Sequence, residues 1–265
     1  MHAKVLRAVM VLITLAALPA TPLAAGEMTL EELIELVRQN ELLYERIDFT
    51  WRCKYETFNR DRLAPDHGSW KTILEEEQQL RLVYQPPYML RRQQSLLLYR
   101  NDEKKELPYY VGYDGEKTRV LFDRGATVSN GYVKQGLYIT PHNLLVHRWA
   151  DIPLSLYLAG TDAINRSQWK VGFRSSVQTY YKGVEEWRGL RCHRVYVHHF
   201  FPGKGDSGAD ELWLAEDRNF IPVRLVNYSF WLSRSDSGGG GEVTEWRELE
   251  PGIWFPWRVQ MEAHY

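Results

Sequence analysis

The sequence predicts a mainly β protein of the α+β class, in which antiparallel strands follow one another along the chain. Between Val177 and Tyr228, three β-rich runs are separated by turn signals at Arg188-Gly189 and Pro202-Gly203. Gaps of this length join antiparallel neighbours, whereas parallel strands need a crossover of about a dozen residues or more. The chain also contains 10 Trp and 16 Tyr. Because aromatic residues favour strands and fill wide interiors, we expect a curved sheet around a large apolar space.

The first 25 residues are the expected targeting segment. Lys4 and Arg7 precede an apolar stretch, residues 8–20, of the length typical of a signal peptide, and we expect cleavage after Ala25. This stretch is short for a transmembrane helix, which needs ~20 residues. We therefore expect an exported, periplasmic protein in which residues 26–265 form a single domain. An uncleaved anchor is the alternative.

An amphipathic helix is predicted near the start of this domain. Thr29 is a suitable N-cap, and Glu31 and Glu32 place acidic side chains in the first turn, where the helix dipole favours them. Apolar residues then recur at helical spacing through residues 33–43. From Ile47 to Thr57 apolar and polar residues alternate, which predicts a strand with one buried and one solvated face.

Three further strand regions follow. Ile73–Tyr84 contains five consecutive Glu and Gln residues that favour a helix, but later alternating leucines favour the strand that we predict. Tyr88–Arg100 is predicted as a strand with a kink in its middle. Tyr109–Phe122 folds back through Asp114-Gly115, a strong hairpin dipeptide.

The segment Pro141–Gly160 departs from the strand pattern. Pro141 suits the first turn of a helix, and apolar residues then recur at roughly helical spacing until Pro153 interrupts them. We predict two short helices, or one kinked helix, ending at Gly160. Because this segment lies between two runs of strands, we expect it to be a lid or plug. The expected lid residues are Leu144, Leu145, Trp149 and Leu156.

The end of the chain predicts two more strands, Glu242–Leu249 and Ile253–Met261, joined by a Pro-Gly turn. The preceding stretch Ser237–Gly241 is rich in glycine, and we expect a flexible hairpin loop there. In the third β-rich run, Glu216–Asn219 interrupts the strand, which resumes at Phe220.

No pattern typical of a catalytic or metal site is present in the sequence. Of the clustered histidines, only His193 and His199 can share a strand face, and no HExxH, CxxC or two-His-one-carboxylate spacing occurs. No G-x-S-x-G elbow occurs, and Cys53 lies within a strand among aromatic residues, a poor place for an activated thiolate. We therefore predict a non-enzymatic protein without cofactors or metals, and keep an uncharacterised hydrolase as a third alternative.

The net charge restricts the classes of binding partner, and the two cysteines leave two redox states open. The formal net charge is -1 and no long basic tract is present, which argues against nucleic acid as a partner. Cys53 and Cys192 either pair in an oxidising compartment or remain buried free thiols. We expect a monomer.

Four strand-and-turn motifs resemble a known family. These motifs are Gly183–Val197 (GVEEWRGLRCHRVYV), Glu211–Leu214 (ELWL), Ile221–Arg224 (IPVR) and Pro251–Pro256 (PGIWFP). They are similar to motifs of the LolA-like proteins, periplasmic lipoprotein carriers whose relatives include the lipoprotein-binding domain of the sigma-factor regulator RseB. The resemblance extends over roughly Thr29 to the C-terminus. It implies a single strongly curved antiparallel sheet forming an open β-barrel, lidded by short helices, with an apolar cavity for acyl chains.

We expect the large apolar side chains that share strand faces to line this cavity. Burying each is worth ~1.5–3 kcal/mol, so other side chains or a ligand must cover these faces. The expected ligand-binding residues are Phe49, Trp51, Tyr55, Leu80, Leu82, Tyr84, Val226, Tyr228, Phe255, Trp257 and Val259, with Phe230 as a further companion. A hollow filled completely by the lid and these side chains is the alternative.

These observations together predict a periplasmic carrier or receptor for the acyl chains of a lipoprotein or of another amphiphile. The alternative is an envelope-stress or assembly module that uses the same sheet to bind a protein partner, as the similarity to RseB implies.

Overall fold

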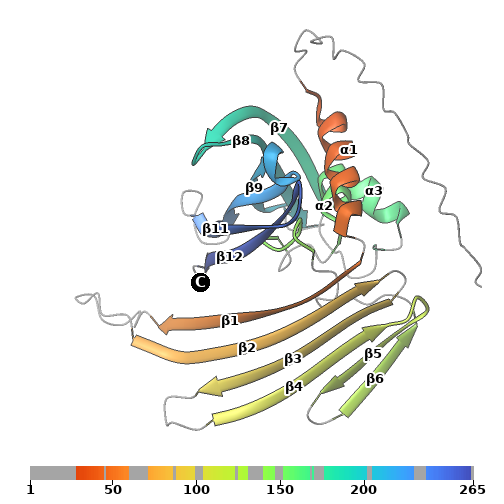
Figure 1. Ribbon diagram of the computed structural model, residues 1–265, viewed down its shortest axis with the longest axis vertical. Helices are drawn as coiled ribbons and strands as arrows, with labels where there is room; N and C mark the ends of the chain where they lie inside the picture. Colours follow the sequence, from red (N-terminus) through yellow and green to blue (C-terminus); the bar gives the residue numbers. More distant parts are fainter. Residues whose placement is uncertain are drawn as a thin grey trace, which may run out of the picture.

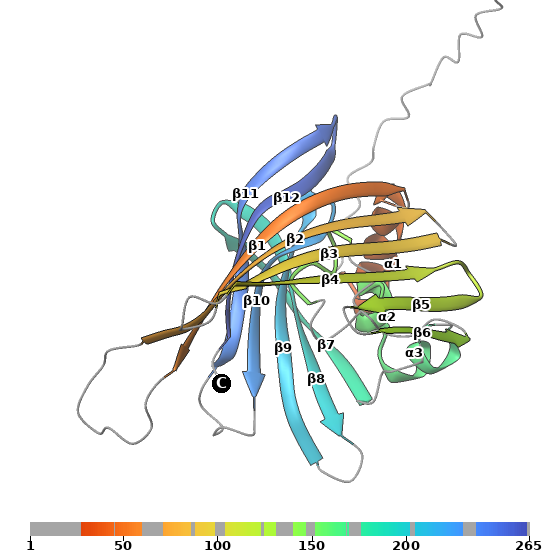
Figure 2. The same cartoon turned by 90° about the horizontal axis from the view of Figure 1, so that it is seen from below.

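The computed structural model describes residues 28–44, 46–59, 71–85, 88–98, 104–122, 125–130, 140–146, 152–167, 169, 176–201, 205–229 and 237–263. These residues form two six-stranded antiparallel sheets, in each of which consecutive strands pair. The sheets face each other, and the helices gather at one end beside the second sheet (Figures 1 and 2). The expected signal peptide, residues 1–25, lies outside the described residues.

The first sheet contains β1 (Ile47–Asn59), β2 (Lys71–Gln85), β3 (Tyr88–Leu98), β4 (Lys104–Tyr113), β5 (Lys117–Phe122) and β6 (Gly125–Asn130). The second sheet contains β7 (Ser176–Trp187), β8 (Leu190–Phe201), β9 (Gly205–Ala215), β10 (Ile221–Ser229), β11 (Ser237–Glu250) and β12 (Ile253–Ala263). The helical elements are α1 (Leu30–Glu41), α2 (Leu154–Ala159), α3 (Thr161–Arg166) and the 3-10 turns η1 (Leu42–Tyr44) and η3 (Glu216–Arg218).

The strands therefore belong to two sheets rather than to the single sheet that we expected. The chain between β6 and β7 includes α2 and α3, whose buried side chains enter the core. This interruption places β6 and β7 at the edges of separate sheets. The two sheets are not closed into a barrel by any strand pairing in the described part of the chain.

Most local signals in the first half were interpreted correctly. Thr29 caps α1 and forms a capping box with Glu32, whose carboxylate accepts from the Thr29 amide at 2.8 Å. The segment around Glu75–Gln79 lies in β2, because pairing with β1 and β3 on both sides outweighs its helix propensity. Asp114-Gly115 connects β4 and β5, and Asp114 Oδ1 accepts from the amides of the turn. The register of β3 is continuous, without the expected kink.

The expectations about two later segments need correction. Residues 141–146 form a series of turns rather than a helix, whereas α2 follows Pro153 and ends at Gly160 as predicted, and a further helix, α3, follows Gly160. The glycine-rich stretch is part of β11 rather than a loop: Gly239–Gly241 pair with β10 on one side and with β12 on the other. Gly240 suits this place because a Cβ there would lie 2.7 Å from the carbonyl oxygen of Leu225.

One hydrophobic core joins both sheets and the helices. It includes Leu33 of α1, Val111 of β4, Leu158 of α2 and Leu212 of β9, all of which are fully buried. A smaller apolar cluster around Cys192 and Trp213 lies on the other face of the second sheet. No helix among the described residues has both the length and the apolar character needed to cross a membrane.

Candidate functional site

The predicted cavity residues of β1 and β2 belong to one face of the first sheet. The register pairs Phe49 with Leu82 and Trp51 with Leu80, and Tyr84 stands opposite Ile47. Tyr55 is further along the same alternation of β1. Leu82 is buried, and Tyr84 packs against the core. For Trp51, Tyr55 and Leu80 the structure describes the backbone alone, so their part in a cavity stays a prediction.

This face meets β12 of the second sheet at one point. The rings of Phe49 and Phe255 contact each other edge to face, with centroids 5.3 Å apart. Val259, four residues further along β12, packs against the core. The contact therefore brings together two sets of predicted cavity residues that are about 200 positions apart in the chain.

Two large apolar side chains further along β12 are incompletely covered. Trp257 lies between Phe255 and Val259 at an irregularity of β12, where Pro256 and Arg258 pair with β11 but Trp257 does not, and 52% of its surface is exposed. The guanidinium carbon of Arg247 lies 3.4 Å from the centroid of its ring. Met261, near the end of β12, is also exposed. Exposed apolar side chains on the strand that carries Phe255 offer a surface that another apolar group can cover.

Val226 and Tyr228 lie away from this region. Tyr228 donates to Glu211 at 3.0 Å, and Val226 packs in the cluster around Trp213, on the outer face of the second sheet. Neighbouring strand residues alternate between faces, so the core-facing residue of β10 is Leu225. The assignment of Val226 and Tyr228 to the same hollow as Phe255 does not agree with this placement. Phe230 lies outside the described residues.

The predicted lid segment packs inside the protein rather than over it. Leu145 is fully buried, Leu156 packs at the edge of the core, and Leu144 is partly buried. Trp149 lies outside the described residues. Of the two functions that we expected for this segment, the structure favours a plug between the sheets.

Glu41 of α1 holds the first turn of α2. Its carboxylate accepts hydrogen bonds from the Leu154 amide at 2.6 Å and from the amide and hydroxyl of Ser155. Burial raises the pKa of Glu41 to about 7, although these hydrogen bonds act in the opposite direction. Glu41 therefore joins α1 to the plug.

A buried polar cluster fastens the same helix to the second sheet. The Tyr157 hydroxyl donates to Asp210 Oδ2 at 2.5 Å and lies 2.8 Å from His199 Nε2. Asp210 also accepts from Asn227 Nδ2 at 2.6 Å and lies 3.2 Å from His199. Burial raises the pKa of Tyr157 well above its ordinary value, so the hydroxyl remains a donor. Each polar group of this cluster has a partner, as a buried group requires.

The other residues considered for chemistry have structural partners. The His193 ring packs between Tyr181 and Phe220, and its Nδ1 lies 3.0 Å from the Tyr181 hydroxyl. Cys192 is a buried free thiol, which agrees with the second of the two alternatives for this cysteine, and burial raises its pKa to about 11. The described residues contain no group of three or more His, Cys, Asp or Glu side chains placed to hold a metal ion.

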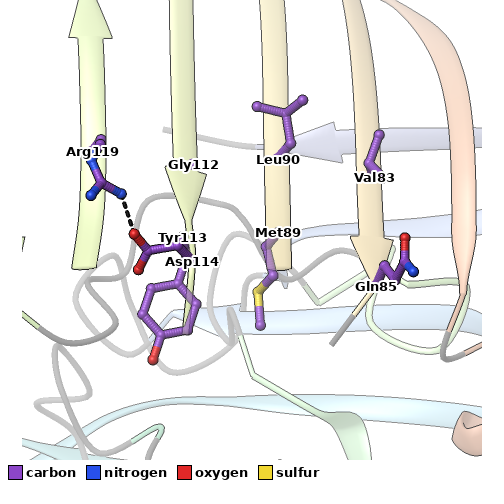
Figure 3. Close-up of a pocket in the computed structure, with 8 residues that line it drawn as sticks. All are labelled: Val83, Gln85, Met89, Leu90, Gly112, Tyr113, Asp114 and Arg119. Atoms are coloured by element: carbon purple, nitrogen blue, oxygen red, sulfur yellow. Dashed lines mark hydrogen bonds and ion pairs between the residues drawn. The ribbon is translucent and has the colours of Figure 1, made fainter. Parts of the chain in front are cut away.

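A hollow that we did not predict lies at Gly112 of β4. The register aligns Val83, Leu90, Gly112 and Arg119 across β2–β5. A hollow of about 290 Å³ is lined by these residues and their neighbours, and the absence of a side chain at Gly112 contributes to it (Figure 3). Arg119 pairs with Asp114 at its rim. A second hollow of about 260 Å³ shares Leu90, Gly112 and Arg119 and extends to β6. An isolated glycine inside a predicted strand was the sequence signal for it.

Comparisons with known proteins reveal distant structural similarity. No family model matches the chain, and no curated protein matches it significantly. A DUF1329 family protein from Desulfovibrio piger is similar with a TM-score of 0.41 and 13% identity, over 88% of this chain and 86% of that one. The lipoprotein LppX of Mycobacterium tuberculosis is similar with a TM-score of 0.30 and 14% identity, over 80% and 89%. Because both TM-scores are below 0.5, the similarity carries no functional conclusion.

Proposed function

We propose that this protein is a periplasmic, non-enzymatic carrier or receptor that binds the acyl chains of a lipoprotein or of another amphiphile. The observation that carries the proposal is the half-exposed Trp257 beside the Phe49–Phe255 contact, where two unclosed sheets meet. An acyl chain that lay along β12 would cover Trp257 and Met261. Burial of such side chains is worth ~1.5–3 kcal/mol each, which is enough for reversible binding.

Transfer rather than turnover is the expected mode of action. The acyl chain enters between the edges of β1 and β12, and its headgroup remains in water near Arg247, whose guanidinium lies over the ring of Trp257. Release follows when an acceptor binds the chain more tightly. The sequence resemblance to LolA-like carriers supports this use of the fold.

Uptake of a dansyl-labelled fatty acid by delipidated protein tests the proposal. We expect saturable uptake, and we expect Trp257→Glu to weaken it by about tenfold, because a carboxylate replaces an apolar contact. Leu121→Glu is the matched control, because Leu121 is also 52% exposed. It lies on the face of the first sheet opposite to that of Phe49. Absence of uptake by folded wild-type protein, or equal weakening by both substitutions, contradicts the carrier function. Mass spectrometry of organic extracts from the purified protein then identifies the cargo.

A protein-binding module remains a second candidate function. It is favoured by the plug segment, whose residues Leu145, Leu154 and Leu158 fill the space between the sheets at the helical end. A purified protein that retains a protein of the cell envelope, and from which no lipid is extracted, supports this candidate.

A further inference from the structure

The edge strand β6 has the features of an unprotected pairing surface. It pairs with β5 over Gly125–Asn130 without any irregularity in the register. Every residue from Ala126 to Asn130 is exposed, and 63% of the Val128 surface is accessible. No described residue pairs with its other edge. Half of its backbone amides and carbonyls therefore point outward, as in any edge strand.

Natural edge strands are commonly blocked by charged side chains, proline, a bulge or a covering segment. β6, with the sequence GATVSN, has no charged residue, no proline and no bulge. At the edge strand β7, in contrast, the Thr161 hydroxyl bonds both the amide and the carbonyl of Val177, at 2.6 and 3.1 Å. The edges β1 and β12 approach each other through Phe49 and Phe255. The edge strands β1, β7 and β12 also contain charged residues, so among the described edge strands β6 is the one without such protection.

We propose that β6 pairs antiparallel with β6 of a second copy of this chain, about a twofold axis perpendicular to the sheet. Such a pair joins the two first sheets into one continuous sheet. The inference departs from the monomer that the sequence suggested, and it does not depend on the proposed lipid binding.

The sequence of β6 suits a partner that is identical to itself. Opposed residues of an antiparallel pair share a face, so the axis passes through Thr127 or Val128. In both registers Val128 meets an apolar side chain, either Val128 or Ala126 of the partner subunit. A charged residue near the axis would meet its own copy, and opposed like charges are destabilising. The neutral strand avoids this repulsion.

Pairing at β6 also buries the apolar surface beside this strand. Leu121, Ala126 and Val128 belong to the lining of the hollow of about 260 Å³ on this part of the sheet. Leu121 is as exposed as Trp257. A strand added at β6 lies about 4.8 Å from it, within reach of Val128 and the open side of the hollow. Pairing therefore combines backbone hydrogen bonds with apolar burial.

Sedimentation velocity over a range of protein concentrations tests the proposal. We expect wild-type protein to shift from monomer to dimer as concentration rises, and Val128→Lys to remain a monomer over the same range. Val184→Lys on β7 is the matched control, since Val184 is an exposed valine on an edge strand that has charged neighbours and a register irregularity, and it should dimerise like the wild type. Circular dichroism establishes that each variant is folded.

Hydrogen exchange of the wild-type protein adds a readout that needs no substitution. We expect the amides of residues 125–130 to become more protected as concentration rises, and those of β7 to remain unchanged. A wild-type protein that stays monomeric at its highest soluble concentration overturns the proposal. So does a dimer that Val128→Lys leaves intact, or one whose formation leaves β6 unprotected.

Discussion

The ring of Phe49 on β1 meets the ring of Phe255 on β12 at an angle of 71° between their planes. These residues belong to edge strands of different sheets, and no described backbone hydrogen bond joins the two strands. The aromatic contact is therefore a side-chain link between the sheets at the place where we propose that an acyl chain enters.

A double-mutant cycle measures this link. Phe49→Leu and Phe255→Leu should each reduce the free energy of unfolding, and together they should reduce it by less than the sum. The expected coupling is about 0.5–1.5 kcal/mol, the usual value for an edge-to-face pair. Urea unfolding of the four proteins gives the values. Combining Phe49→Leu with Tyr180→Leu, on the distant strand β7, should be additive; equal coupling in both cycles contradicts a direct interaction.

The pH dependence of the free energy of unfolding should reveal the titration of the Glu41 carboxyl group. Its pKa is about 7 in the folded protein and 4.5 when unperturbed. Between these values the folded state retains a proton that the unfolded chain has released, so the free energy of unfolding falls as pH rises from about 4.5 to about 7 and then levels off. The loss is up to about 3 kcal/mol. Urea unfolding at several pH values should show that Glu41→Gln removes this slope. Glu31→Gln, in the exposed first turn of α1, should leave it unchanged.

Asn219 should be among the most sensitive positions outside the core. Its backbone is left-handed, with φ of 57°, and its side chain accepts from the Trp254 amide at 2.9 Å and donates to the Gly252 carbonyl at 2.9 Å. It also accepts from the Tyr44 hydroxyl, and its carbonyl oxygen lies 2.7 Å from His142 Nε2. Asn219→Ala should lower the free energy of unfolding by about 2–4 kcal/mol, because several buried groups lose partners and alanine disfavours this backbone.

Asn219→Asp is the informative comparison for that substitution. It retains the acceptor for Trp254 and Tyr44 but loses the donor to Gly252, so we expect a smaller decrease. The midpoints of urea unfolding, taken with one common dependence of free energy on urea concentration, give the change in free energy of unfolding for both variants. Equal stability of the wild-type protein and the alanine variant would show that the hydrogen bonds of Asn219 contribute nothing.

Two glycines of the sheets should respond in opposite directions to alanine. At Gly112 the nearest atom to an added Cβ is the Met89 carbonyl oxygen at 3.9 Å, so Gly112→Ala should stabilise the strand by roughly 0.5–1 kcal/mol. At Gly240 the corresponding distance to the Leu225 carbonyl oxygen is 2.7 Å, so Gly240→Ala should destabilise the protein. Thermal unfolding of both variants tests these two expectations. A change of the unfolding temperature in the same direction in both variants contradicts them.

Local signals were enough to place most strands, the turn at Asp114-Gly115 and the capping box of α1. Each depends on residues that are a few positions apart, and the hydrogen bonds involved form within that distance. The same signals failed at Gly239–Gly241, where glycine predicts a loop but close approach of the Leu225 carbonyl requires it within a strand. Around Glu75–Gln79 the alternating leucines predicted the strand correctly against the local helix propensity, which strand pairing on both sides outweighs.

What sequence reasoning did not reach is the arrangement between distant segments. Periodicity shows that Val226 and Tyr228 share a face, but whether that face meets the core depends on which side of the second sheet the plug occupies. The contact of Phe49 with Phe255 and the burial of Glu41 against α2 each join residues that are more than 100 positions apart. Their free energy comes from packing that exists only after folding, so no local pattern records them.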